Sequence, residues 1–488
     1  MASTRIRAIH RIAIIGAGPS GVAAAKGILV ELGDVEIDIF EQQISFGGVW
    51  NYSSNPNGTI DVPQTDPNYL FREPFHRSDK DEVPNACLDG TCEATFASPM
   101  YDRLEANTPH FSMKFSDAPS LENNQLFPFR EDVKQYLEIY GQDVRHLVHF
   151  QTQVIDVRRK GASSQEGWIV QTKDLVHPTL IQEREYHALI IANGHYTVPR
   201  LPAIKGIRDW DKTNQGLISH SKSYRRPEPF AHKKTIVVGN SASTIEIAAQ
   251  ISEVCKRPLL NSIRSGPALL HDADYCQIVP EIVEFLASSD GRRAVRFSDG
   301  RIERDIEAIV FCTGYFYSVP FLSSLSPEII ATGDRVQHLY QHIWYIPDPT
   351  LVFVGLPSKI VPFPTVEGQV AVIARVWSQR LSLPSEDDMR KWEKARITEC
   401  GDGKAFHVLA PLADLDYHNE MVAWASSANG ETGQKLPPPW SEQDRWTRER
   451  LPKIRKAFAE KGEERHRVRT IEELGFDYNA WRRENSHG

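Results

Sequence analysis

The sequence feature that most constrains the fold is the stretch RIAIIGAGPSGVAAAKGILVELG, Arg11 to Gly33. Its first apolar run, Ile12 to Ile15, predicts a short buried strand. Gly16, Gly18 and Gly21 follow in G-x-G-x-x-G spacing. In that spacing the first glycine permits a tight turn, the second lets a pyrophosphate approach the backbone, and the third lets a helix pack closely on the strand. The stretch therefore predicts a dinucleotide-binding turn.

The residues after this turn complete a βαβ unit. Val22 to Leu32 are mostly apolar or small and predict a helix, with Gly33 as its C-cap. The N–H groups at the start of such a helix attract phosphate. The next apolar run, Val35 to Phe40, ends at Glu41, twenty residues after Gly21. A carboxylate at that distance can bind the hydroxyls of a ribose. The strand, glycine turn, helix, second strand and acid of a nucleotide site therefore follow one another at the expected spacing.

Length, charge and cysteine content narrow the class of protein. A chain of 488 residues favours two domains, or one large domain with an insertion. The net charge of -8 gives no basic field, so we expect no nucleic-acid partner. No apolar run has the length of a bilayer span, and six cysteines are few enough to be free thiols in a reducing compartment. We therefore expect a cytoplasmic protein without a membrane anchor.

A glycine pair follows Glu41 in SFGGVWNYS, where Gly47 and Gly48 predict a tight bend before Trp50. On its own this is a turn beside a core tryptophan. Together with the βαβ unit, it resembles the flavin-containing monooxygenase family, in which a Gly-Gly-x-Trp loop contacts FAD. The resemblance covers about residues 8 to 385 and is closest to the fungal and yeast thiol-oxidising type.

The segment ANTP contains the candidate for a catalytic side chain, Asn107. Pro109 holds the preceding Thr108 extended, and without further context Asn107 is a turn residue. The resembled family has an Asn-x-Pro at this place, with the asparagine pointing at the reactive edge of the flavin. The resemblance therefore implies that the Asn107 amide bonds to a flavin-bound peroxide or to the nicotinamide.

Cys87 and Cys92 have the C-x-x-x-x-C spacing that flavin disulfide reductases also use. In those enzymes the pair directly follows the first βαβ unit, a place that GGVWN holds here. The two cysteines flank LDGT, a turn sequence, so we favour a loop with free thiols over a redox pair. The surrounding residues 51 to 98 lack a sustained period and predict a mostly irregular excursion.

The next part of the chain predicts one helix and three strands. HFQTQVIDVRR and GWIVQTK alternate apolar and polar residues, as antiparallel strands do. Ala188 to Ala192 predict a buried strand that runs into NGHY, Asn193 to Tyr196, which by resemblance closes the FAD site. One helical face is expected to hold Val133, Tyr136, Leu137 and Tyr140.

A second nucleotide site is predicted in KKTIVVGNSASTIEIAAQISEVC, which reads as strand, turn and helix. Gly239, Ser241 and Ser243 replace the three glycines, and the Ser241 hydroxyl can donate to a phosphate. In the next strand, PLLNSIRSG, Arg264 stands near the place of an acid and can pair with a 2′-phosphate. We therefore expect NADPH rather than NADH, with an unrelated surface charge as the alternative. The helix is expected to bury Ile245, Ala248, Ala249, Ile251 and Val254.

GLISHSKSY matches a family fingerprint before this second site through Gly216, His220 and Tyr224. Asn214 departs from it, since the fingerprint begins with Phe. A tryptophan in place of Tyr224 would have pointed to Baeyer–Villiger enzymes. A lone histidine is more often structural, and we expect His220 to position the chain rather than transfer protons.

The last third predicts the return to the first domain. DIEAIVFCTGY and Leu351 to Val354 predict buried strands, and a helix is expected to start near Thr365. The N-terminus of that helix can stabilise the negative charge of reduced flavin, and Gln369 is a candidate polar contact. Residues 385 to 488 are charged with helical periods, and we expect peripheral cover without chemistry.

The resemblance implies an α/β fold with two dinucleotide-binding, Rossmann-like domains, the NADPH domain being inserted in the FAD domain. The expected limits are residues 1–212 and 326–488 for the two parts of the FAD domain, the second with a helical C-terminal cover, and residues 213–325 for the NADPH domain.

The resemblance also implies an NADPH-dependent flavin monooxygenase. It would form a hydroperoxyflavin and transfer one oxygen atom from O2 to a small nucleophile: a thiol, sulfide or amine. The sequence has no Ser/His/Asp or paired-carboxylate signature, in agreement with chemistry carried by a cofactor. The alternatives are a Baeyer–Villiger enzyme acting on a ketone and, less favoured, an FAD/NADPH disulfide reductase or a binding module. A homo-oligomer is left open.

No metal ligand is predicted, and Asn107 is the one predicted catalytic residue. The predicted cofactor-binding residues are Gly16, Gly18, Pro19, Ser20, Gly21, Glu41, Gly48, Val49, Trp50, Asn107, Thr108, Val154, Asn193, Gly194, Gln369, Tyr224, Gly239, Ser241, Ser243, Thr244 and Arg264.

Overall fold

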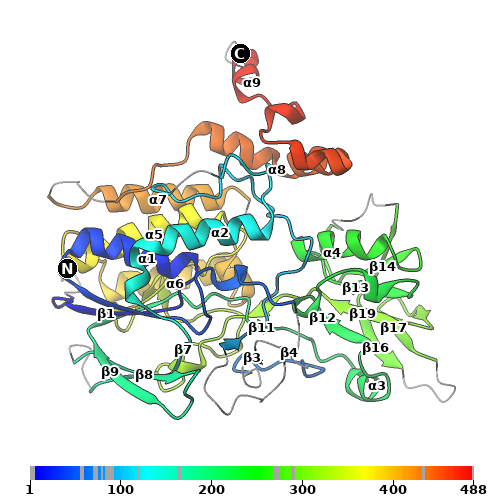
Figure 1. Ribbon diagram of the computed structural model, residues 1–488, viewed down its shortest axis with the longest axis horizontal. Helices are drawn as coiled ribbons and strands as arrows, with labels where there is room; N and C mark the ends of the chain where they lie inside the picture. Colours follow the sequence, from blue (N-terminus) through cyan, green and yellow to red (C-terminus); the bar gives the residue numbers. More distant parts are fainter. Residues whose placement is uncertain are drawn as a thin grey trace.

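The computed structural model describes residues 6–54, 60–69, 75–78, 81–82, 93–118, 121–161, 166–267, 270, 274–286, 292–409, 411–430 and 435–485. Two largely parallel sheets organise it, the first on the left of Figure 1 and the second on the right. Helices cover both sheets, as expected for the α/β class. No helix in these ranges is both long and apolar enough to cross a membrane.

The first sheet has seven strands in the order β21-β22-β23-β10-β1-β2-β6. Strands β23, β10, β1, β2 and β6 run parallel, and β21 and β22 are antiparallel additions. In sheet order the bounds are Leu339–Tyr340, Trp344–Tyr345, Leu351–Phe353, Ala188–Ile191, Arg11–Ile15, Glu36–Phe40 and Val148–His149. The central strands are buried on both faces, which explains their continuous apolar runs.

Helices stack on one face of this sheet, and a smaller sheet lies on the other (Figure 1). α1 packs on α5, and α5 packs on α7. The contact between α1 and α5 is close: a Cβ on Gly27 would lie 2.4 Å from the Val370 side chain. The helices are α1 Pro19–Leu32, α2 Arg130–Gly141, α5 Pro362–Trp377 and α7 Ala413–Ser426, and the opposite sheet has β7 Thr152–Arg159, β8 Trp168–Asp174 and β9 Ile181–Tyr186.

The second sheet has the order β12-β19-β13-β14-β15 with all strands parallel. Helix α4, Ala242–Ser252, follows β13 and packs on this sheet. A three-stranded antiparallel sheet and the short helix α3, Ile207–Thr213, complete this part. The parallel strands are Ile218–His220, Ala308–Phe311, Thr235–Val238, Leu259–Ser262 and Cys276–Val279, and the antiparallel ones are β16 Ile282–Leu286, β17 Ala294–Phe297 and β18 Ile302–Glu303.

The two sheets are Rossmann-like units, and the second is inserted in the first. Strands from before and after the second sheet, such as β10 and β23, pair in the first. The two chain segments that connect the sheets also pair with each other: β11, Val198–Pro199, is antiparallel to β20, Tyr315–Phe316. The predicted fold class is confirmed, whereas the limits at 212/213 and 325/326 stay predictions. Helix α3 runs across the first of them.

Several local predictions agree with the structure. α1 ends at Gly33, which has a positive φ of 67°, and β7 and β8 form the expected antiparallel pair. α5 begins at Pro362, three residues before the expected start near Thr365. The predicted face of α2 is buried at Val133, Tyr136, Leu137 and Tyr140.

Two expectations were wrong. The first concerns Ile245, which is 39% exposed, because α4 turns Ile247, Ala248 and Ile251 toward the second sheet instead. The segment 51–98, expected to be mostly irregular, contains one small three-stranded sheet, with β3 Phe75–Ser78, β4 Asp81–Glu82 and β5 Glu93–Thr95.

The second wrong expectation concerns residues 385–488. They are not only peripheral, because Tyr417 and Met421 of α7 are part of the main core. The remaining helices there are α6 Glu386–Cys400, α8 Glu442–Glu460 and α9 Tyr478–Asn485, preceded or joined by short 3-10 turns such as η6, Lys404–His407.

Candidate functional site

The glycine turn between β1 and α1 is too tight for side chains at two of its positions. Gly16 has a φ of 107°, and a Cβ on it would lie 2.5 Å from the carbonyl oxygen of Ala192. A Cβ on Gly21 would lie 1.8 Å from the carbonyl oxygen of Gly16. The turn therefore touches the end of β10, and the helix packs on the strand as the spacing predicts. Asn193, next to Ala192, is brought beside this turn.

The first turn of α1 is open to an anion. No side chain in the described residues caps Gly18, and no acid stands in the first turn, which contains Pro19 and Ser20. Its N–H groups therefore lack the partners that a helix start requires. The predicted bend at Gly47 and Gly48 is confirmed, with φ values of 115° and 54°.

That bend brings the short helix η1, Gly48–Trp50, against the glycine turn. A Cβ on Gly48 would lie 3.0 Å from the Cα of Gly18. The backbone N–H of Gly47 donates to the carbonyl oxygen of Ala17 at 3.3 Å. The two glycine segments thus form one backbone surface with no side chain between them.

Glu41 is fixed beside the same turn. Its carboxylate accepts hydrogen bonds from the backbone N–H of Ala17 at 2.7 Å and of Gln43 at 2.8 Å. Burial raises the pKa of Glu41, and the backbone donors oppose that shift. Each carboxylate oxygen keeps a lone pair for a further donor, which is what binding of ribose hydroxyls requires.

The loop after β10 carries a histidine that local sequence did not single out. Both ring nitrogens of His195 are buried and have no hydrogen-bond partner among the described residues. Its ring lies against those of Tyr196 and Tyr317, with centroids 4.3 and 5.1 Å away. Burial, and then the charge of Lys404, lowers the pKa of His195 to about 4. Unpaired buried polar atoms at this place fit a bound group.

Asn107 is an exposed residue in a loop whose adjacent residues, Ala106 and Thr108, are buried. The N–H of Ala106 donates to Pro128 at 2.8 Å, and the N–H of His110 donates to Leu126 at 2.9 Å. From α8, the guanidinium of Arg455 donates to the carbonyl oxygen of Ala106 at 2.6 Å. The Asn107 side chain has one long contact, at 3.4 Å, from the hydroxyl of Thr108. Its amide N–H groups are therefore available to a ligand.

The segment before Asn107 contacts the second Rossmann unit. Tyr101 packs on Tyr224, with ring centroids 5.4 Å apart. Arg103 forms an ion pair with Glu253 at 2.8 Å. The segment before Asn107 thus places this loop where the two units meet. Buried Tyr224 donates its hydroxyl to Gln250, so its side chain serves packing.

The second glycine turn follows β13. Gly239 has a φ of 140°, and a Cβ there would lie 2.6 Å from the carbonyl oxygen of Cys312. The hydroxyl of buried Thr244 accepts the N–H of Ser241 at 3.3 Å and so shapes the turn. Ser241 and Ser243 are exposed at the start of α4, and Arg264 is exposed after β14. These residues line the carboxyl edge of a parallel sheet, where ligands of such folds bind.

His220 has the positioning role expected of it. Its Nδ1 accepts the N–H of Lys222 at 3.1 Å, so the neutral ring carries its hydrogen on Nε2, which donates to the carbonyl oxygen of Gly314 at 3.0 Å. Burial lowers the pKa of His220 to about 3. The neutral ring, hydrogen-bonded at both nitrogens, fixes β12 to the segment that follows β19. With this pKa the ring does not gain a proton near neutral pH.

Two predicted cofactor residues are buried beneath the first site. Gln369 accepts the N–H of Gly355 at 2.9 Å and donates to the hydroxyl of Tyr417 at 2.9 Å. Gly355 touches the glycine turn, because a Cβ on it would lie 2.6 Å from the Ser20 hydroxyl. Val154 lies in β7, in the core cluster that contains Phe40. Cofactor contact by Gln369 and Val154 stays a prediction.

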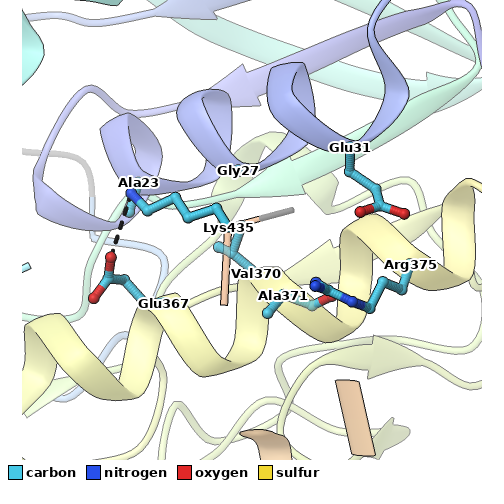
Figure 2. Close-up of a pocket in the computed structure, with 8 residues that line it drawn as sticks. All are labelled: Ala23, Gly27, Glu31, Glu367, Val370, Ala371, Arg375 and Lys435. Atoms are coloured by element: carbon cyan, nitrogen blue, oxygen red, sulfur yellow. Dashed lines mark hydrogen bonds and ion pairs between the residues drawn. The ribbon is translucent and has the colours of Figure 1, made fainter. Parts of the chain in front are cut away.

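A charged seam lies between α1 and α5, away from both turns (Figure 2). Lys435 pairs with Glu367 at 3.3 Å, and Arg380 pairs with Glu31 at 2.7 Å. Glu31, Glu367, Arg375 and Lys435 are the charged residues that line a cavity of about 10 Å³, the size of one water molecule. Figure 2 shows Glu31 on α1, Glu367 and Arg375 on α5, and Lys435 from a later segment around it, so the seam joins these elements and has no room for a substrate.

The described cysteines do not form a redox pair. Cys255, Cys276, Cys312 and Cys400 are free thiols. Burial raises the pKa of Cys276 to about 11 and that of Cys312 to about 12, so neither is a thiolate near neutral pH. The predicted loop thiols Cys87 and Cys92 lie outside the described residues.

Comparison with known proteins defines the class. A family model described as flavin-binding monooxygenase-like matches residues 90–275 and 275–405. The chain belongs to the flavin-containing monooxygenase family, as its motifs predicted. It is an FAD- and NADPH-dependent monooxygenase, and the predicted cofactors are confirmed at the level of the family.

Several relatives cover almost the whole chain. The chain is 31% identical over 449 residues to the thiol-specific monooxygenase of Saccharomyces cerevisiae, covering 89% of each chain. Over 442 residues it is 32% identical to flavin-containing monooxygenase FMO GS-OX-like 9 of Arabidopsis thaliana, covering 87% of this chain and 88% of the relative. The structure of S-allyl-L-cysteine S-oxygenase from Allium sativum matches with a TM-score of 0.71 and 28% identity. The match covers 97% of this chain and 98% of the S-oxygenase chain.

Proposed function

We propose that this monooxygenase transfers one oxygen atom from O2 to the sulfur of a small thiol or sulfide, with an amine as the next candidate. The observation that carries the proposal is similarity over nearly the full chain to a thiol-specific monooxygenase and an S-oxygenase. Both glycine turns have features that suit a nucleotide, which supports the proposal. The reaction balances as substrate, O2, NADPH and a proton giving oxygenated substrate, water and NADP+.

FAD would bind at the first glycine turn. The open N–H groups of α1 suit its pyrophosphate, and the Glu41 carboxylate suits its ribose. Gly48, Val49 and Trp50 would lie along the flavin, and the start of α5 would face its negatively charged ring when reduced. When bound, FAD would supply the redox chemistry, taking reducing equivalents from NADPH and activating O2 for transfer of one oxygen atom to the substrate.

NADPH would bind at the second turn. Exposed Ser241 can donate to a phosphate at the start of α4, and exposed Arg264 can pair with the 2′-phosphate. Asn107, at the junction of the two units, would donate its amide N–H to the oxygenated flavin or to the nicotinamide. The protein's task is therefore to bind, orient and keep water from the reacting groups.

The free thiols argue against a disulfide reductase. None of the described cysteines stands at the first glycine turn, where the Gly47–Trp50 segment lies instead. We also propose a cytoplasmic location, which these unpaired thiols support because a reducing compartment keeps thiols free.

A substrate screen tests the proposed function. FAD-loaded protein, NADPH and O2 are combined in parallel with a thiol, a sulfide, a tertiary amine and a ketone, and the products are identified by mass. We expect a sulfoxide from the sulfide or, from the thiol, a sulfenic acid that condenses with a second thiol to a disulfide and water. An ester from the ketone, with the sulfur compounds unchanged, would contradict the proposal in favour of the Baeyer–Villiger alternative. NADPH-dependent reduction of a disulfide without oxygenation of any compound would contradict both.

A further inference from the structure

Lys404 lies in the C-terminal segment for which we expected no chemistry, yet it reaches the second Rossmann unit. Its ammonium lies at Gly314, where a Cβ would come within 2.8 Å of Nζ. Gly314 follows β19 and has a φ of 78°. The glycine therefore leaves space for the lysine at the carboxyl edge of the second sheet.

The backbone beneath Lys404 is anchored to the first unit. Phe406 and His407 are fully buried, and the N–H of Ser358 donates to the carbonyl oxygen of His407 at 2.9 Å. The N–H of Val336 donates to the His407 ring at 3.2 Å. Lys404 thus belongs to the first unit, where buried neighbours fix its backbone. Its ammonium lies against the second unit.

The charge of Lys404 is not neutralised by an acid. The described residues contain no hydrogen bond or ion pair to its ammonium, although the side chain as a whole is exposed. Burial of the ammonium end, and then the guanidiniums of Arg200 and Arg264, lower the pKa of Lys404, while Asp334 opposes that shift. Asp334 is itself paired with Arg200. An excess of positive charge remains, and an anion would relieve it.

The strand order places this charge relative to the predicted cofactor. Across the carboxyl edge the neighbours are β19, β13 and β14, so Gly314 stands on one side of the Gly239 turn and Arg264 on the other. A dinucleotide whose adenosine ribose lies toward β14 has its pyrophosphate at the central glycine turn. Lys404 then approaches from the side away from the 2′-phosphate.

We propose that Lys404 binds the pyrophosphate of the nicotinamide cofactor, as a cation that the first unit supplies to the site on the second. The inference rests on the proposed function, since it requires the second turn to hold NADPH. The cofactor then contacts both units. Arg264 of the second unit binds the 2′-phosphate, and Lys404 of the first unit binds the pyrophosphate, which NADPH and NADH share. A contact of this kind also draws the two units together around the cofactor.

Binding measurements on FAD-loaded protein test this assignment. Affinity is measured by calorimetry for NADP+ and, by competition, for 2′-AMP, which carries the 2′-phosphate and no pyrophosphate. We expect Lys404→Met to weaken NADP+ binding about tenfold, as loss of one charge-assisted contact does, and to leave 2′-AMP binding unchanged. Arg264→Met should weaken both ligands. The matched control is Lys394→Met, an exposed lysine on α6, which should bind both ligands as the parent does.

Two results would overturn the assignment while leaving the proposed function intact. One is NADP+ binding by Lys404→Met that equals that of the parent. The other is an equal loss for NADP+ and 2′-AMP, which would place the lysine at the 2′-phosphate. If the unmodified protein binds no NADP+ at all, the nicotinamide site of the proposed function fails and the assignment fails with it.

Discussion

The carboxylate of Glu41 accepts the backbone N–H of Ala17 at 2.7 Å, so the acid at the end of β2 is fixed to the glycine turn that follows β1. These residues come from neighbouring parallel strands of the first sheet. The contact links two parts of one site: the turn that suits a pyrophosphate and the carboxylate that suits a ribose.

Glu41→Gln should weaken FAD binding. The amide has one acceptor oxygen, so it cannot accept from both Ala17 and Gln43 as the carboxylate does. The neutral amide also lacks the charged acceptor that the ribose hydroxyls would meet, and a hydrogen bond to a charged group contributes about 1.5 to 3 kcal/mol, which corresponds to about a tenfold to hundredfold loss of FAD affinity. FAD titration of the apoprotein measures it. Glu36→Gln, an exposed change at the start of β2, is the control. Unchanged FAD affinity in Glu41→Gln would contradict the assignment.

Asn107→Ser should separate NADPH consumption from oxygenation. The serine hydroxyl is shorter than the amide and cannot reach the same acceptor. We expect FAD content to stay at the parental level while product formation falls about a hundredfold, as loss of one donor to developing charge does. Product and NADPH consumed are measured in the same assay. Asn123→Ser, in an exposed turn, serves as the control. Parental coupling in Asn107→Ser would remove this residue from the mechanism.

Arg455→Met should disturb the same step without touching a cofactor. Arg455 donates to the carbonyl oxygen of Ala106 and its guanidinium lies 4.8 Å from the centre of the Phe127 ring. Methionine keeps contact with the ring and loses the hydrogen bond, so the Asn107 loop loses one of its supports. We expect about tenfold less product per NADPH, with FAD content and NADP+ affinity unchanged.

The conservative variant and a neighbour on α8 complete that test. Arg455→Lys should restore part of the coupling, because an ammonium can still donate to Ala106. Lys453→Met, an exposed change on the same helix, should leave coupling at the parental value. A loss of FAD that accompanies the loss of coupling would show a general structural effect instead of positioning.

Lys222 should make stability depend on pH above neutrality. It is buried, and its ammonium donates to the carbonyl oxygen of Thr197 at 2.5 Å. Burial, and then the charge of Arg225, lowers the pKa of Lys222 from 10.5 to about 7. Between these values the unfolded chain binds more protons than the folded one, so this lysine makes stability rise with pH, by up to about 1.4 kcal/mol per pH unit.

Thermal melting between pH 7 and pH 9 checks the effect of Lys222. In Lys222→Met the melting temperature should rise less with pH than in the parent, because the proton difference at this site is gone. Lys212→Met, an exposed lysine on α3, should follow the parental curve. Identical pH dependence in Lys222→Met and the parent would mean that the folded protein keeps this lysine fully charged.

Local patterns predicted the parts of the fold that local physics determines. The strand, turn and helix from Arg11 to Gly33 could be predicted because three glycines, a short apolar run and a helical period coincide within one segment. The buried face of α2 follows in the same way from apolar residues spaced three and four apart. For α4 the same rule predicted wrongly that Ile245 is buried. Small and apolar residues occur on more than one face of this helix, so only its packing on the sheet determines which of them are buried.

The sequence could not predict contacts between distant segments. Arg455 and Ala106 are 349 positions apart, and Gln369 and Tyr417 belong to different helices. Nothing in the charged, periodic sequence of α8 indicates that this helix will contact the Asn107 loop. For the same reason Lys404 was assigned to a peripheral cover, although it reaches Gly314. The unpaired nitrogens of His195 likewise become visible only when the surrounding rings are in place.

Isotope labelling tests the central claim most directly. FAD-loaded protein is supplied with NADPH, 18O2 and a sulfide, because a sulfoxide keeps its oxygen whereas the sulfenic acid from a thiol can lose it as water on forming a disulfide; the mass of the product is measured by mass spectrometry. We expect one 18O atom in each oxygenated product molecule and one NADPH consumed for each. Product without the label, or O2 recovered entirely as hydrogen peroxide while the sulfur compound stays unchanged, would contradict it.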